Sequence, residues 1–116
     1  MKYTFLLLAF VGTPLWAAEW LTKPGAVPLN QQELDGLAGR TLTFYDDGRS
    51  KFSAGGAYSY TYAGGDSAFG TYSIAHDGSI CIAYRNGFSR CDLYVHSGDR
   101  LILITEEGER YPVRPE

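Results

Sequence analysis

Hydrophobic and polar residues alternate in short runs from residue 40 onward, and glycine-rich turn signals separate the runs. Alternation with a period of two is typical of β-strands that place one face on a core. The predicted strands are 40–46, 49–54, 57–63, 68–75, the two strands of a hairpin within 79–96, 101–105 and 109–113. Together with one preceding helix, they predict a mainly β chain, an antiparallel eight-strand meander that forms a small barrel or a sandwich.

The hairpin within 79–96 contains both cysteines and an Asn-Gly pair between two β-rich runs, which is a strong turn signal. A three-residue loop that ends in this glycine pairs Tyr84 with Phe88. In that register Cys81 lies directly opposite Cys91, whereas a two-residue loop misses the pairing by one residue. We therefore predict a structural disulfide between Cys81 and Cys91, which stabilises the fold by roughly 2–3 kcal/mol.

The same hairpin has apolar residues on both faces. Cys91, Leu93 and Val95 share one side of the second strand. We take this cysteine face as the interior, although the pattern also permits the inverse assignment. Four residues would then point outward, beneath the helix, the leader or a partner, and they are Ile80, Ile82, Tyr84 and Tyr94.

A short helix is predicted at roughly 31–38. Asn30 is an N-cap residue, and Glu33 stands three positions later, which is the pattern of a capping box. Leu29 and Leu34 occupy the positions of a hydrophobic staple. Gly39 supplies a residue suited to the left-handed conformation after the last turn.

The first 17 residues have the pattern of a secretory signal peptide, with one lysine, a short apolar run and small residues at the end. The small residues permit cleavage after Ala17 or after Ala18. Residues 18–29, with two prolines and a glycine, predict an extended leader whose Trp20 folds back over the core. We expect a periplasmic or secreted protein, a compartment in which a disulfide persists.

Composition indicates a single β-domain over residues 30–116. Removal of the signal peptide takes away one lysine and no acid, so the formal net charge goes from −3 to −4. A weakly acidic domain lacks the basic surface of a nucleic-acid binder. It is equally unsuited to anionic lipid, and we expect no membrane insertion after cleavage.

Tyr58, Tyr60 and Tyr62 project from the same face of one predicted strand. Aromatic rings with polar tips can stack on sugars or line a ligand groove, although tyrosine is also a common strand residue that covers a sheet. This stripe is the candidate binding surface. Three further tyrosines extend it, and they are Tyr72, Tyr84 and Tyr94.

No residue pattern predicts an enzyme. His76 and His96 are the only histidines, and neither has the spacing of a metal site. The Gly-Asp-Ser sequence at 65–67 is similar to the nucleophile block of one esterase class, but the parallel sheet which that class requires is missing from the pattern. We expect no cofactor and no metal. Three acids far apart in sequence can still meet in space, and they are Asp46, Asp66 and Asp92.

Several short motifs accompany the helix and the cysteines. They are Gly39-Arg40-Thr41-Leu42, Gly70-Thr71-Tyr72, Gly78-Ser79-Ile80-Cys81, Arg90-Cys91 and Gly108-Glu109-Arg110. With the signal peptide, they give a chain that resembles small exported proteobacterial proteins of an uncharacterised domain family. The resemblance implies a helix, a Gly-x-Trp/Tyr strand and a cysteine hairpin, and it implies no catalytic residue. Periplasmic lysozyme inhibitors are similar at the level of fold alone.

These observations predict an exported binding module for a small ligand, a glycan or a protein. The alternative is an envelope structural or interaction protein, or an inhibitor of a secreted enzyme.

Overall fold

The computed structural model describes residues 20–116. The predicted signal peptide, its cleavage point and the first residues of the leader lie outside the described residues. The elements are β1 (Ala26–Pro28), α1 (Gln31–Asp35), β2 (Thr41–Thr43), β3 (Arg49–Phe52), β4 (Ala57–Thr61), β5 (Ser67–Ile74), β6 (Ile80–Tyr84), β7 (Ser89–Ser97), β8 (Arg100–Thr105) and β9 (Arg110–Pro112).

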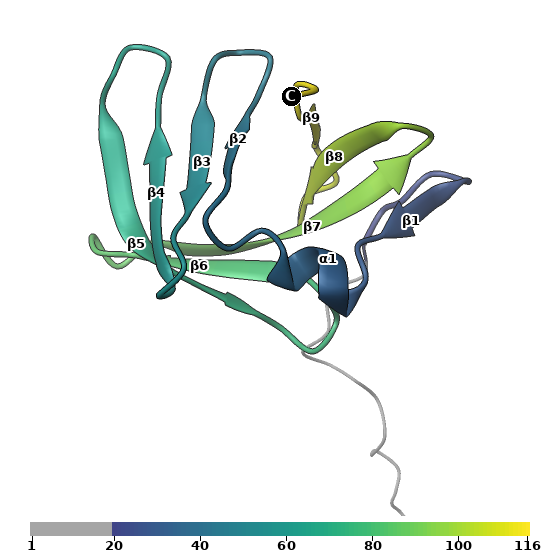
Figure 1. Ribbon diagram of the computed structural model, residues 1–116, viewed down its shortest axis with the longest axis horizontal. Helices are drawn as coiled ribbons and strands as arrows, with labels where there is room; N and C mark the ends of the chain where they lie inside the picture. Colours follow the sequence, from purple (N-terminus) through teal and green to yellow (C-terminus); the bar gives the residue numbers. More distant parts are fainter. Residues whose placement is uncertain (1–19) are drawn as a thin grey trace, which may run out of the picture.

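Strands β2 to β9 form an antiparallel meander that curves into a half-barrel (Figure 1). This confirms the predicted mainly β, eight-strand meander. The leader contributes a ninth strand that the sequence did not predict: β1 pairs with the end of β7, where β7 extends past Ile80, the first residue of β6. A bridge between Phe44 and Val113 brings the two ends of the meander together.

The helix α1 has the capping box predicted for it. The Glu33 backbone N–H donates to the Asn30 side chain at 2.9 Å, and the Asn30 N–H donates to the Glu33 carboxylate at 2.9 Å. The helix ends with the cap residue Gly36, which is earlier than predicted, and the chain continues in turns to Gly39, whose φ is +88°. It is not the first element, because β1 precedes it.

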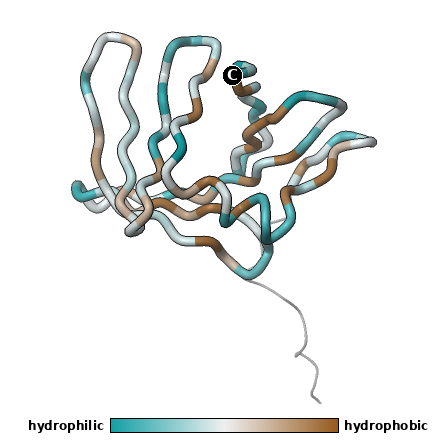
Figure 2. The backbone as a smooth tube through the Cα atoms, viewed as in Figure 1, coloured by the Kyte–Doolittle hydropathy of each residue, from teal (hydrophilic) through white to brown (hydrophobic). Residues whose placement is uncertain are grey.

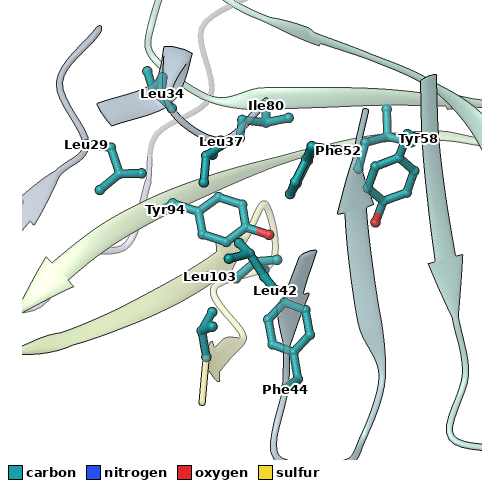
Figure 3. Close-up of a cluster of buried hydrophobic side chains, with 12 residues drawn as sticks. Leu29, Leu34, Leu37, Leu42, Phe44, Phe52, Tyr58, Ile80, Tyr94 and Leu103 are labelled. Carbon is teal, nitrogen blue, oxygen red and sulfur yellow. The ribbon is translucent and has the colours of Figure 1, made fainter. Parts of the chain in front are cut away.

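The main core lies inside the half-barrel, where α1 covers one end (Figure 3). Leu34 and Leu37 pack near Ile80 and Tyr94, and Phe52 contacts the rings around it edge-on or at a tilt. The interior face predicted for the hairpin is therefore wrong. Ile80, Ile82 and Tyr94 are buried inside, Tyr84 is half-buried there, and both cysteines lie on the outer face.

The reason for this inversion is a second apolar cluster on the outer face. It consists of Leu93, Val95, Ile102 and Ile104. Trp20 and Ala26 of the leader cover it, and the Trp20 indole N–H donates to Asp77 at 3.0 Å. The most hydrophobic stretches of backbone accordingly include β7 and β8, while the β4–β5 hairpin is paler (Figure 2). The prediction that Trp20 folds back over a core is confirmed.

The cysteine hairpin has the predicted register. The Tyr84 backbone N–H donates to Phe88 at 2.8 Å, and Cys81 lies opposite Cys91 with the Cα atoms 4.0 Å apart. The two residues form the predicted disulfide. Gly87 takes a φ of +91°, as the loop requires.

Candidate ligand-binding hollow

The six tyrosines of the predicted surface all line the inner side of the half-barrel, but at different depths. Tyr58 and Tyr94 are buried in the core, and each side chain is 2% exposed. The Tyr58 hydroxyl shares a 2.8 Å hydrogen bond with Ser50, and burial raises the pKa of both phenols. These two tyrosines stabilise the core and cannot contact a ligand directly.

The remaining tyrosines lie closer to solvent. Tyr72 and Tyr84 are half-buried, and the Tyr72 hydroxyl donates to the Ser53 carbonyl at 2.9 Å. Tyr60 is also half-buried, while Tyr62 is 56% exposed. The rings of Tyr60 and Tyr62 lie 4.9 Å apart and nearly perpendicular. The accessible part of the predicted stripe is therefore its outer end.

That outer end opens on a hollow of about 500 Å³. It is lined by residues that follow β2, by β4, by the start of β7 and by the β8–β9 turn, so four separate parts of the meander contribute to it (Figure 1). Its aromatic side chains are Phe44, Tyr60, Tyr62, Phe88 and Tyr111. Its charged side chains are Asp46, Arg90, Asp92, Glu106, Glu107 and Glu109.

Arg90 and Asp92 form the base of this hollow. The Arg90 Nε lies 3.1 Å from the Asp92 carboxylate, but this buried N–H has no aligned hydrogen-bond acceptor, so the pair is a contact ion pair. The guanidinium lies over the rings of Tyr60 and Tyr84 at 5.9 and 5.8 Å. Burial raises the pKa of Asp92 to about 6, although Arg90 opposes this change.

Tyr60 is positioned by a close approach to Gly48. A Cβ atom at residue 48 would lie 2.0 Å from the Tyr60 hydroxyl. The neighbouring Asp46 carboxylate accepts the Gly48 backbone N–H at 2.9 Å. Burial and the Asp46 charge both raise the pKa of Tyr60. The β2–β3 turn therefore fixes one aromatic wall and one acid of the hollow together.

Sequence reasoning found two of the aromatic residues of the hollow and missed the others. Phe88 and Tyr111 stand next to turns, and strand alternation places Arg90 on the face opposite Cys91. Turn position and periodicity therefore contained a signal for these three residues. Of the three acids for which the sequence left a meeting in space open, Asp46 and Asp92 both line the hollow, and Asp66 does not.

The histidines lie outside the hollow. His76 is exposed in the turn before β6. The His96 Nε2 lies 2.6 Å from the Glu33 carboxylate and so connects β7 to the start of α1. Within residues 20–116, no group of three or more His, Cys, Asp or Glu side chains could hold a metal ion. No helix of the described chain is long and apolar enough to cross a membrane.

The chain matches no family model, no curated protein and no solved structure. The resemblance to small exported proteobacterial proteins therefore stays a prediction.

Proposed function

We propose that this protein is a small exported binding module that takes up a small ligand in the hollow of its half-barrel. One observation supports this proposal above the others. Three large aromatic side chains stay exposed around a concave surface, where Tyr62, Phe88 and Tyr111 are 56%, 62% and 43% exposed. Exposed apolar groups that converge on a concavity are typical of ligand sites.

Export is proposed from the cysteines and the N-terminus. The Cys81–Cys91 disulfide is typical of an oxidising compartment. The predicted signal peptide points to the same compartment, and the protein would act in the periplasm or outside the cell.

A binding role is favoured over catalysis by the chemistry of the hollow. Its one deeply buried acid, Asp92, is already paired with Arg90, and the histidines that could act as bases lie elsewhere. We assign no catalytic residue.

A protein partner is the second candidate, either in the envelope or as a secreted enzyme that this chain inhibits. The observation that favours it is the position of Phe88, which is 62% exposed beside the tip of the cysteine hairpin. Docking of a protein would use the same aromatic rim.

The test begins with NMR screening of a library that covers sugars, amines, carboxylates and neutral aromatics. Native mass spectrometry of protein purified from its own envelope runs in parallel. We expect at least one small molecule to shift resonances of the hollow residues. Tyr62→Ala should then weaken binding by about five-fold or more, because an aromatic contact is lost. The matched control is Tyr45→Ala, which removes a ring that is equally exposed (54%) and does not line the hollow.

Two results would contradict the proposal. The first is a library in which no compound shifts the hollow residues. The second is a bound compound whose affinity falls with Tyr45→Ala and not with Tyr62→Ala. A stable protein subunit in the native mass spectrum, with no small molecule, would favour the second candidate.

A further inference from the structure

The hollow combines aromatic walls with an acidic rim, and we infer that it selects ligands that carry an organic cation, an ammonium or a guanidinium group. The inference rests on the proposed function, because it assigns a ligand class to the same site. Four features of the hollow support it.

The first feature is the pair of aromatic walls. Tyr60 and Tyr62 meet nearly at a right angle, 79°, with their ring centroids 4.9 Å apart. Tyr111 and Phe88 add exposed rings to the lining of the same hollow. The face of an aromatic ring carries negative charge density and attracts ammonium and guanidinium groups.

The second feature is a cation already held by this wall. The Arg90 guanidinium lies 5.9 Å from the Tyr60 ring centroid and 5.8 Å from that of Tyr84, beside the Asp92 carboxylate. The chain thus shows that its own aromatic wall accepts a planar cation next to an acid. A ligand cation would meet the same kind of surroundings on the solvent side of Tyr60.

The third feature is the imbalance of charge. Arg90 is the only basic side chain that lines the hollow among the described residues, and Asp92 already compensates it. Four more carboxylates line the hollow without a basic partner there, and they are Asp46, Glu106, Glu107 and Glu109. A cleft lined by one sign of charge attracts ligands of the opposite sign and repels those of the same sign.

The fourth feature is the Asp92 carboxylate. Its side chain is only 3% exposed, yet it lines the hollow. Within the described chain its one charged contact is Arg90 Nε, which is not aligned for a hydrogen bond. A buried carboxylate normally accepts several hydrogen bonds. An ammonium or guanidinium group of a ligand can supply a further N–H donor to this carboxylate, beside Arg90.

The test compares three probes that share a phenyl ring and differ in charge: phenethylammonium, 2-phenylethanol and phenylacetate. Affinities are measured by NMR titration of the mature protein at about pH 7.5, at about 20 mM and about 500 mM salt. We expect the cation to bind about ten-fold more tightly than the alcohol at low salt, and the acid to bind most weakly. The advantage of the cation should shrink at high salt, because exposed charges are screened.

Variants connect this preference to the acids of the hollow. Glu106→Gln/Glu107→Gln should weaken binding of the cation about three- to ten-fold and leave the affinity for the alcohol unchanged. The matched control is Asp35→Asn/Asp99→Asn, which removes the same charge at exposed positions outside the hollow. It should leave all three affinities within about two-fold of the wild type, because neither carboxylate lines the hollow and both are exposed to solvent.

A short lysine-rich peptide and a free diamine then distinguish the sources of such a cation. Tighter binding of the peptide indicates a basic protein segment, and tighter binding of the diamine indicates a small amine. Either order supports the inference.

Two outcomes overturn it. If the alcohol or the acid binds as well as the cation, the ligand class is wrong while the hollow remains a binding site. If none of the probes shifts the hollow residues, the cation inference fails. The broad library screen then decides separately whether the proposed function fails with it.

Discussion

Arg90 and Asp92 lie two residues apart on the inner face of β7, with the Arg90 Nε 3.1 Å from the Asp92 Oδ2. Burial raises the pKa of Asp92 from 3.8 to about 6, and Glu106 and Glu107 add to this shift, while Arg90 opposes it. The folded protein therefore holds a proton on Asp92 more tightly than the unfolded chain does.

This relationship predicts a specific pH dependence of stability. Between about pH 4 and pH 6 the folded state binds a proton at Asp92 that the unfolded state has released, so this residue makes folding more favourable as the pH falls. Above about pH 6 the carboxyl is ionised in both states, and the folded state carries the net penalty that remains after Arg90 offsets part of the desolvation. That net penalty is about 2–3 kcal/mol.

The variant Asp92→Asn isolates the effect. This variant has no titrating group at residue 92. Its unfolding free energy minus that of the wild type should therefore rise by about 2 kcal/mol between pH ~4.5 and pH ~7.5. Urea unfolding at several pH values measures this difference. The pKa values of Glu33 and Asp77 are lowered, so these two residues change stability with pH in the opposite sense. Both are present in the wild type and in the variant, so their effects cancel in the difference. Parallel stability curves for the two proteins would contradict the prediction.

Gly48 should be needed for the shape of the hollow. A Cβ atom there would lie 2.0 Å from the Tyr60 hydroxyl and 2.8 Å from its Cζ. Gly48→Ala should force the ring to move, at a cost of about 1–2 kcal/mol in stability. Because Tyr60 forms one wall of the hollow, ligand affinity should fall by about five-fold or more.

Gly55→Ala is the control for this change, because no atom lies within 4 Å of the added Cβ. Thermal unfolding and the NMR signals of the Tyr60 ring report the two effects. If Gly48→Ala and Gly55→Ala behave alike, Gly48 does not position Tyr60.

The disulfide should contribute to stability and not to binding. It connects neighbouring residues of β6 and β7 on the outer face, and the 92–97 part of β7 is also paired along its length with β8. Cys81→Ser/Cys91→Ser should lower the free energy of unfolding by about 2–3 kcal/mol. Affinity for a ligand of the hollow should stay within about two-fold, because Arg90 keeps its place on β7.

Urea unfolding measures the loss of stability, and wild-type protein treated with a reductant should match the double variant. A large loss of ligand affinity in a variant that is still folded would mean that the bridge also shapes the hollow.

The sequence predicted the strands and the disulfide well because turn chemistry is local. The Asn-Gly loop needs a left-handed glycine, and Gly87 with its φ of +91° sets the register that brings Cys81 opposite Cys91. The capping box of α1 is local in the same way, since Asn30 and Glu33 satisfy each other across three residues.

The faces of the hairpin could not be assigned so readily, because β7 is apolar on both sides. Val95 is fully buried on the outer face under the leader, and Tyr94 is buried on the inner face. Alternation of apolar and polar residues identifies the core face of a strand only where the other face is exposed to solvent. Strand periodicity could not predict the hollow either. Its residues Asp46, Asp92 and Tyr111 come from different strands and turns, and only the curvature of the sheet brings them together.

Trp20 should stabilise the fold by covering the outer cluster and holding the leader against the sheet. Its ring packs on the cluster of Leu93, Val95, Ile102 and Ile104, and its indole N–H donates to Asp77 at 3.0 Å. Trp20→Phe keeps most of the apolar contact and loses the hydrogen bond, and it should cost about 1 kcal/mol. Trp20→Ala also exposes the cluster, and we expect a total cost of about 2–4 kcal/mol.

Urea unfolding of the mature protein, followed by far-UV circular dichroism, compares the three proteins on one scale. The wild type can be followed by fluorescence as well, because Trp16 belongs to the predicted signal peptide and Trp20 is then the single tryptophan. Equal midpoints for the wild type and Trp20→Ala would show that the outer cluster is stable without the Trp20 ring. A graded loss, smaller for phenylalanine than for alanine, follows if the ring and its hydrogen bond each hold the leader on the sheet.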